Sequence, residues 1–127
     1  MPADDPARAK SALRAEMRAR LRAIPPARRA EWSRAIVRTL AALPEFAAAR
    51  AVLFYHPMIE AGEVDILPLA SRALAEGKLV AFPRMDWSSP DAPMSVARVT
   101  SLVEDFDFPA RPPPNPLPSL PTVSVDQ

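Results

Sequence analysis

The chain has 127 residues, a formal net charge of +1 and no cysteine. This length suffices for one domain with a buried core but not for two. The absence of cysteine excludes a disulfide framework and any cysteine-based metal site. No apolar run approaches the roughly 20 residues that cross a bilayer, and the first residues lack the features of a secretory signal or transit peptide. We therefore expect a cytoplasmic protein.

The small net charge hides an uneven distribution of charged residues. Residues 1–50 contain 11 Lys or Arg and 5 Asp or Glu, whereas residues 51–127 contain 5 and 10. A basic half is typical of proteins that bind a polyanion such as a nucleic acid, a membrane surface or a nucleotide phosphate.

Two amphipathic helices are predicted in the basic half. The first begins at Asp5-Pro6, where an N-cap residue precedes a proline, and it ends at Pro25-Pro26. The second follows it and ends at Pro44. Apolar residues recur in each helix at spacings of four, four and three. They are Leu13, Met17, Leu21 and Ile24 in the first helix, and Trp32, Ile36, Leu40 and Leu43 in the second.

The segment from Ala51 to Asp86 predicts a βαβ unit. An apolar run over residues 51–55 stops at His56-Pro57, and a short polar loop leads to a helix that begins near Asp65 and ends at Gly77. A second apolar run over residues 79–82 stops at Pro83-Arg84. Open α/β sheets bind ligands at the carboxyl ends of their strands, so the polar residues of this unit are candidates for a binding site.

The remaining sequence predicts one more strand and a tail. Residues 94–99 alternate loosely and favour a third strand, and residues 102–108 form a connector. Seven of the thirteen residues from Pro109 to Pro121 are proline, which predicts either an extended wrap or disorder. We therefore expect an α/β domain over residues 1–108, with a thin sheet, followed by a proline-rich tail over residues 109–127.

Four cations on the first helix are candidates for phosphate binding. Their spacing of four places them in one stripe, formed by Lys10, Arg14, Arg18 and Arg22. Such a stripe can hold a triphosphate. It can also be a solvated helix face, which the spacing alone favours.

The strand ends supply the other candidates. Glu63 lies on the loop after the first strand, where a carboxylate can bind donors on a heterocycle, and Met58 can line an aromatic-ligand pocket or fill the core. His56 is the only histidine, and a packed or half-exposed histidine is favoured over an acid–base catalyst. Arg84 can meet a phosphate or pair with Asp86 or Asp91. With only two glycines, the chain has no glycine-rich phosphate loop.

The order and spacing of several short motifs resemble the 5-formyltetrahydrofolate cyclo-ligase family. The motifs are Lys10-x-x-Leu13-Arg14, Ser33, residues 43–46, Tyr55-His56-Pro57-Met58, residues 62–65, Gly77-Lys78, Pro83-Arg84 and residues 94–99. The resemblance covers about 90 residues, from Lys10 to Val99.

This resemblance implies an enzyme that uses ATP and Mg²⁺ to convert 5-formyltetrahydrofolate into 5,10-methenyltetrahydrofolate, with release of ADP and phosphate. It implies ATP contacts by Lys10, Arg14 and Arg84, and a folate pocket lined by His56, Met58 and Glu63. The implied fold is a three-layer α/β/α Rossmann-like sheet. The implied protein is a monomer that binds its small-molecule substrate and ATP, but neither nucleic acid nor membrane.

The chain departs from the family pattern after Phe108. The family's Glu-Pro pair, its glycine-rich segment and its Mg²⁺ ligands have no counterpart in this sequence. We therefore expect the N-terminal two-thirds of such an enzyme, an incomplete sheet and little or no turnover by these residues alone, with metal ligands beyond them.

The second hypothesis is a binding module without catalytic activity. In it, the basic helices bind a polyanion and the proline-rich tail binds a partner groove. The enzyme hypothesis predicts that Lys10→Ala and Glu63→Ala matter most, whereas the second predicts that Arg18→Glu and Arg22→Glu do.

Overall fold

The computed structural model describes residues 5–91, 94–108 and 114–124, which form a mixed α/β structure. The helices are α1 (Pro6–Ala23), α2 (Pro26–Ala41), α3 (Pro44–Ala48), the short 3₁₀ helix η1 (Ile59–Ala61) and α4 (Leu67–Ala75). The strands are β1 (Ala51–Leu53), β2 (Leu79–Met85), β3 (Met94–Val99), β4 (Phe106–Asp107) and β5 (Asn115–Pro116). Both long helices and the third strand were predicted, whereas α3 was not.

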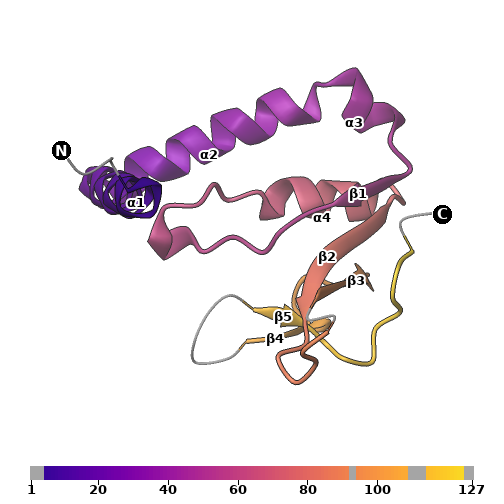
Figure 1. Ribbon diagram of the computed structural model, residues 1–127. Helices are drawn as coiled ribbons and strands as arrows, with labels where there is room; N and C mark the ends of the chain where they lie inside the picture. The colour runs from indigo at the N-terminus through magenta and orange to yellow at the C-terminus, as the bar shows by residue number, and fades with distance from the viewer. Residues whose placement is uncertain (1–4, 92–93, 109–113, 125–127) are drawn as a thin grey trace.

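A three-stranded sheet in the order β1-β2-β3 carries the fold. β1 and β2 are parallel and are joined through α4, so the predicted βαβ unit is confirmed. β2 and β3 are antiparallel, and β4 pairs with β5 in a separate two-stranded sheet. Figure 1 shows α4 near the start of β2, the long helix α2 above it running from α1 to α3, and β4 and β5 where β2 ends. The carboxyl ends of β1 and β2 therefore approach the β4–β5 pair.

The prediction that the second strand stops at Pro83-Arg84 was wrong, because β2 continues to Met85. Alternate residues of β2 face β1: Leu79 donates its N–H to the Arg50 carbonyl, and Ala81 accepts the N–H of Phe54. Pro83 is next in this alternation, and β1 has already ended there. A proline is tolerated at this position because no neighbouring strand needs its N–H.

The ends of α4 lie next to Asp65 and Gly77, as predicted, although the residue at the N-cap position is Ile66, which makes no side-chain capping hydrogen bond. The Asp65 carboxylate accepts the N–H of Leu67 at 3.1 Å. At the other end Gly77 has a φ of 76°, and Lys78 donates its N–H to the Ala73 carbonyl. This closure needs a residue in the left-handed conformation, which glycine adopts without strain.

The core lies between α4, α2 and one face of the sheet. Its buried residues are Phe54, Ile66, Leu69, Ala70, Ala73, Val80, Phe82, Val99 and Phe106, and Val37 and Leu40 of α2 pack against them. On the opposite face of the sheet, the Leu53 side chain is 60% exposed. The expected three-layer arrangement, with helices on both faces, is not confirmed by the described residues.

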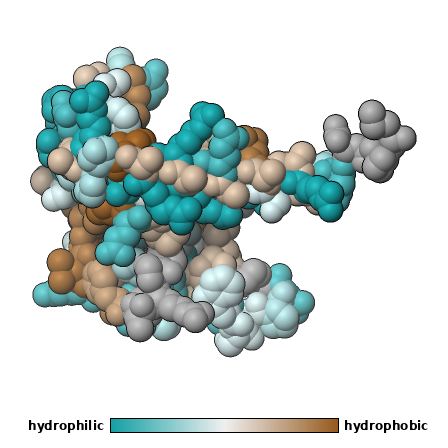
Figure 2. All heavy atoms as spheres, turned by 90° about the vertical axis from the view of Figure 1, so that its left-hand side faces the viewer, coloured by the Kyte–Doolittle hydropathy of each residue, from teal (hydrophilic) through white to brown (hydrophobic). Residues whose placement is uncertain are grey.

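Helix α1 packs on the rest of the molecule mainly through its C-terminal end. None of its residues is buried, and Leu13 and Met17 of its apolar stripe are exposed. Leu21 of α1 lies against Gly62, in the loop between β1 and α4. Figure 2 shows α1 running across one face and extending beyond the molecule at its N-terminal end. The prediction that this helix buries its apolar face is therefore met only in part.

Residues 114–124 take the extended wrap that was one of the two expectations for the tail. Thr122 forms an antiparallel bridge with Ala97, and Val123 donates its N–H to the Val96 carbonyl. This segment therefore covers the outer edge of β3. Residues 109–113 and 125–127, on which the rest of that expectation falls, lie outside the described residues. The boundary between residues 108 and 109 stays a prediction.

Within the described part of the chain, no helix has the length and apolar character needed to span a membrane.

Candidate functional site

The loop after β1 folds back on itself and brings Met58 and Glu63 together. The Met58 carbonyl accepts the N–H groups of Ala61 and Glu63, and the Glu63 carboxylate accepts the N–H of Met58 at 3.4 Å. Gly62 allows this bend with a φ of 92°. A Cβ atom at Gly62 would lie 3.0 Å from the Leu21 Cβ, so glycine also permits α1 to approach the loop.

Three hydrogen bonds hold the loop in place. The Ser33 hydroxyl of α2 accepts the N–H of Asp65 at 3.0 Å, and Arg29 donates from Nη1 to the Ile59 carbonyl at 3.0 Å. The Tyr55 hydroxyl donates to the Val64 carbonyl at 3.2 Å. Burial, Glu63 and Asp65 together raise the pKa of Tyr55, so this hydroxyl stays protonated as a donor. The loop is therefore a defined surface for a ligand.

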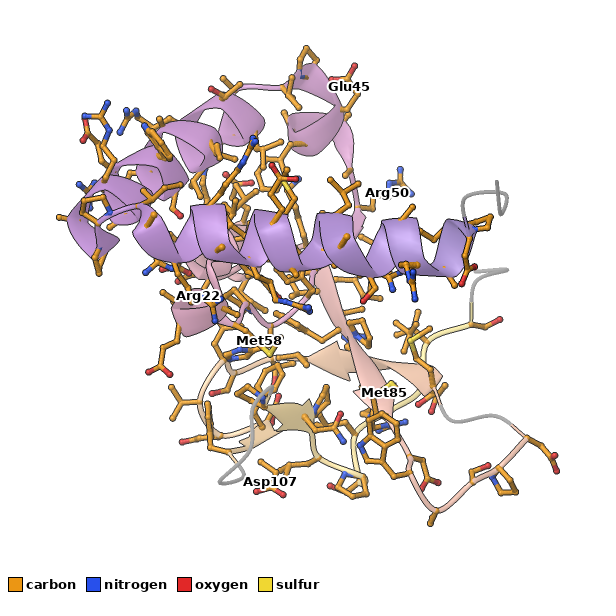
Figure 3. The ribbon with its side chains drawn as sticks, turned by 60° about the vertical axis from the view of Figure 1, so that its left-hand side comes forward. Arg22, Glu45, Arg50, Met58, Met85 and Asp107 are labelled. Carbon is orange, nitrogen blue, oxygen red and sulfur yellow. The ribbon has the colours of Figure 1, made fainter. Side chains whose placement is uncertain are left out.

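Two cavities open on this loop and share His56, Met58 and Pro114. The smaller cavity has a volume of about 260 Å³. It is lined by Tyr55, His56, Met58, Glu63, Phe82, Pro83, Met85, Phe106, Pro114 and Asn115. The larger cavity, of about 760 Å³, is lined by Arg18, Arg22, His56, Pro57, Met58, Ile59, Glu60, Ala61, Phe108 and Pro114. Figure 3 shows Arg22 reaching from the end of α1 toward Met58. Concave sites with a few polar groups on apolar walls are typical of small-molecule binding.

His56 lies between the core and both cavities. Its ring centroid is 5.2 Å from that of Phe106 and 6.0 Å from that of Phe108, in edge-on geometry. Its Nδ1 is buried without a hydrogen-bond partner. Burial lowers the pKa of His56 below 6.5, outweighing the opposing effects of the Pro57 backbone and Asp65. The neutral imidazole therefore predominates at pH 7.

Lys10 and Arg14 lie on the part of α1 that extends away from the loop, and they line neither of these cavities. Arg18 and Arg22, the other half of the same stripe, line the larger cavity. The stripe thus divides into two cations at the cavity and two farther along the helix. The structure brings His56, Met58 and Glu63 together, as expected, but does not bring Lys10 or Arg14 to them.

Arg84 is engaged by the tail. Its Nη1 donates to the Leu117 and Leu120 carbonyls at 3.1 and 2.8 Å, and its Nη2 to the Thr122 hydroxyl at 2.7 Å. It also donates from Nε to the Ser95 hydroxyl at 3.1 Å. The alternative ion pair with Asp86 or Asp91 does not occur among the described residues. The Asp86 carboxylate instead accepts hydrogen bonds from Ser88, which lower its pKa.

A magnesium site was expected beyond these residues. Among the described ones, no group of three His, Asp or Glu side chains is placed to hold a metal ion. Mg²⁺ is usually held by one or two carboxylates together with substrate phosphates and water, so the described residues do not by themselves form a site for the ion. Of the carboxylates on the loop after β1, Glu60 lines the larger of these two cavities and Glu63 the smaller.

The candidate residues chosen from the sequence did not include those that the later part of the chain contributes to the cavities, namely Phe106, Phe108, Pro114 and Asn115. Phe106 and Phe108 alternate with acidic residues, and this period-two pattern was a local signal for a short strand. Pro114 and Asn115 carry no such signal. Asn115 exchanges hydrogen bonds with the Met85 backbone at 2.9 Å in both directions, which places the tail beside the smaller cavity.

Comparisons with known proteins identify the family. A search of curated proteins found no match. The family model described as the 5-formyltetrahydrofolate cyclo-ligase family matches residues 6–120 of the 127-residue chain. This match covers both long helices, the sheet and the loop that carries His56, Met58 and Glu63. The chain belongs to the 5-formyltetrahydrofolate cyclo-ligase family.

Proposed function

We propose that the loop after β1 binds 5-formyltetrahydrofolate and forms the folate-binding wall of an ATP-dependent cyclo-ligase. The reaction converts this folate into 5,10-methenyltetrahydrofolate, with release of ADP and phosphate. The observation that carries the proposal is the convergence of His56, Met58 and Glu63 on one cavity at the carboxyl end of β1. Family membership supports the same assignment.

Each of these side chains has a role that its surroundings support. The Glu63 carboxylate accepts the N–H groups of the pterin ring, because it is half-buried and a single backbone N–H occupies one of its oxygens. Met58 and Phe106 offer polarisable and aromatic surface to the ring. His56, held neutral by burial, supplies one further hydrogen bond.

The cations of α1 are the proposed contacts for ATP. Lys10 and Arg14 are exposed and lie on one helix face, so they are free to approach a triphosphate. Arg84 completes the proposed set, but it would first have to release the carbonyls of the tail. ATP, when bound, turns the formyl oxygen into a good leaving group, and the chain's own contribution is to hold and orient the folate.

The cellular and structural parts of the proposal follow from the family. We propose a cytoplasmic monomer that binds neither nucleic acid nor membrane. We also propose the three-layer α/β/α Rossmann-like arrangement for the fold. The exposed Leu53 on the uncovered face supports it, because a second helical layer would bury that side chain.

The second hypothesis, a binding module without activity, has less support. Its proline-rich tail was expected to offer itself to a partner groove. In the described segment 114–124, the Leu117 and Leu120 carbonyls instead accept hydrogen bonds from Arg84, and Thr122 is bridged to Ala97. The polar groups that a partner would use are already engaged with the sheet.

The test is an assay of the purified chain with 5-formyltetrahydrofolate and Mg-ATP, following the methenyl product by its absorbance. We expect weak or no turnover, because phosphoryl transfer depends on Mg²⁺ and on closely placed donors, and Lys10 and Arg14 line neither folate cavity. Robust turnover would contradict this expectation.

A further inference from the structure

A third cavity lies beside α2, on the other side of Glu63 from the smaller cavity. This α2 cavity has a volume of about 370 Å³. Its apolar walls are Pro26, Ala30, Val37, Ile59 and Pro68, and its charged residues are Arg29, Arg34, Arg38, Glu63 and Asp65. Three guanidinium groups therefore meet two carboxylates around an apolar space.

Arg29 presents an unused donor in this cavity. Its Nη1 is fixed by the Ile59 carbonyl at 3.0 Å, whereas its Nε is buried and has no hydrogen-bond partner. Such a buried N–H is rare, because leaving it unpaired costs free energy. Among the described residues, one other buried side-chain nitrogen or oxygen lacks a partner, and it is the Nδ1 of His56. Each orphaned atom thus belongs to a residue that lines a cavity.

The cations of the α2 cavity are not neutralised by its own carboxylates. Arg34 and Arg38 are one turn apart, so their like charges repel. Neither forms an ion pair with Glu63 or Asp65 within the described ranges. The two carboxylates already accept backbone N–H groups, from Met58 and from Leu67. An anion bound here would relieve this repulsion.

We propose that the α2 cavity is a second ligand site, which binds a small carboxylate or phosphate anion with an apolar body. The guanidinium groups hold the anionic group, since arginine donors match the oxygens of carboxylates and phosphates. The apolar walls take the body of the ligand. The site shares Glu63 with the smaller folate cavity and Ile59 with the larger one, but the argument for it does not depend on the proposed function.

The experiment is an NMR titration of the isotope-labelled chain, observing the arginine Nε–H resonances. The probes are benzoate, phenyl phosphate and acetate, and Arg29→Lys assigns the Arg29 resonance by removing it. We expect benzoate and phenyl phosphate to shift this resonance saturably, and acetate to bind more weakly because it has almost no apolar body. Whichever of the two ring-bearing probes binds more tightly identifies the preferred anion.

Two variants of α2 test the role of the cations. Arg34→Ala combined with Arg38→Ala should weaken binding of the ring-bearing probes about tenfold or more, the value of charge-assisted hydrogen bonds. Both side chains are exposed, so the fold should be retained. Arg28→Ala is the matched control, because the Arg28 guanidinium lies over the Trp32 ring at 5.4 Å and does not line the cavity.

Three results would overturn the proposal. They are the absence of a saturable shift at Arg29, equal binding of acetate and benzoate, and equal losses of affinity in Arg28→Ala and the double variant. Binding of 5-formyltetrahydrofolate, measured separately on the same proteins, tells a failure of this site from a failure of the folate site.

Discussion

At the residue scale, His56 connects the hydrophobic core to the candidate site. Its ring packs edge-on against Phe106 and Phe108, and its Nδ1 has no partner in the described structure. The same burial that seats the ring disfavours its charged form. Because burial favours the neutral imidazole, protonation of His56 should destabilise the fold. The pH dependence of stability therefore tests how the ring is packed.

We predict that the chain loses stability as the pH falls below about 6.5. The pKa of His56 is lowered in the folded state, so the unfolded chain takes up the proton first. The stabilisation by the neutral imidazole is fully present above the pKa that His56 has in the unfolded chain. It is lost as the pH falls toward the lower pKa that His56 has in the folded state. Urea unfolding between about pH 7.5 and 5.5 measures this, since carboxylates titrate lower. His56→Gln should flatten the slope, and an unchanged slope would contradict the assignment.

Gly62 is the second residue on which the site depends. Its positive φ and its close approach to Leu21 predict that Gly62→Ala destabilises the chain by about 1–3 kcal/mol. Gly77→Ala is the control, because Gly77 also has a positive φ but a Cβ there meets no atom within 4 Å. Denaturant unfolding should show a larger loss at Gly62. Equal losses would mean that the contact with α1 is not close.

At the scale of elements, Arg84 joins β2 to the tail. We predict that Arg84→Lys loosens residues 117–123, because lysine cannot supply the fork of donors that reaches the Leu117 and Leu120 carbonyls. Hydrogen exchange should become faster at the amides of Arg98 and Val123. These N–H groups donate to the Pro121 and Val96 carbonyls and so join β3 to the tail. The amides between β1 and β2 should not change. Arg98→Lys is the control, because the Arg98 side chain is exposed.

An Arg84→Lys chain whose tail amides exchange at the wild-type rate would show that the bridge of Thr122 to Ala97 is sufficient to hold the tail.

Local signals were enough for most elements of the fold. The spacing of apolar residues predicted α1 and α2, and prolines marked where both begin, while Gly77 marked the end of α4. The two apolar runs and the helix between them predicted the parallel βαβ unit. The continuation of β2 through Pro83 was missed, because it depends on where β1 ends, and that is not a local property of the second strand.

The site was predictable at the end of β1 and not beyond it. His56, Met58 and Glu63 follow one strand closely, so the general rule for strand ends places them together. The contributions of Phe108, Pro114 and Arg18 depend on contacts between segments that are distant in the sequence. No periodicity reveals such contacts. The same holds for Arg84, whose partners lie more than 30 positions away.

At the scale of the whole molecule, the chain combines one well-formed wall of a ligand site with a long basic helix. The β1 loop is fixed by α2 through Ser33 and Arg29, whereas the N-terminal part of α1 extends beyond the molecule. The proposed folate contacts are therefore preorganised, and the proposed ATP contacts are not. Preorganised contacts lose less entropy on binding. We accordingly expect the chain to bind 5-formyltetrahydrofolate better than it binds ATP.

The most direct test of the folate site is a calorimetric titration of the chain with 5-formyltetrahydrofolate. The account predicts saturable binding that Glu63→Gln weakens about tenfold or more, since a hydrogen bond to a charged group contributes about 1.5–3 kcal/mol. Glu45→Gln is the matched control, because Figure 3 shows Glu45 on α3, far from Met58. Equal affinities of wild type and Glu63→Gln, or no binding by the wild-type chain, would contradict the account.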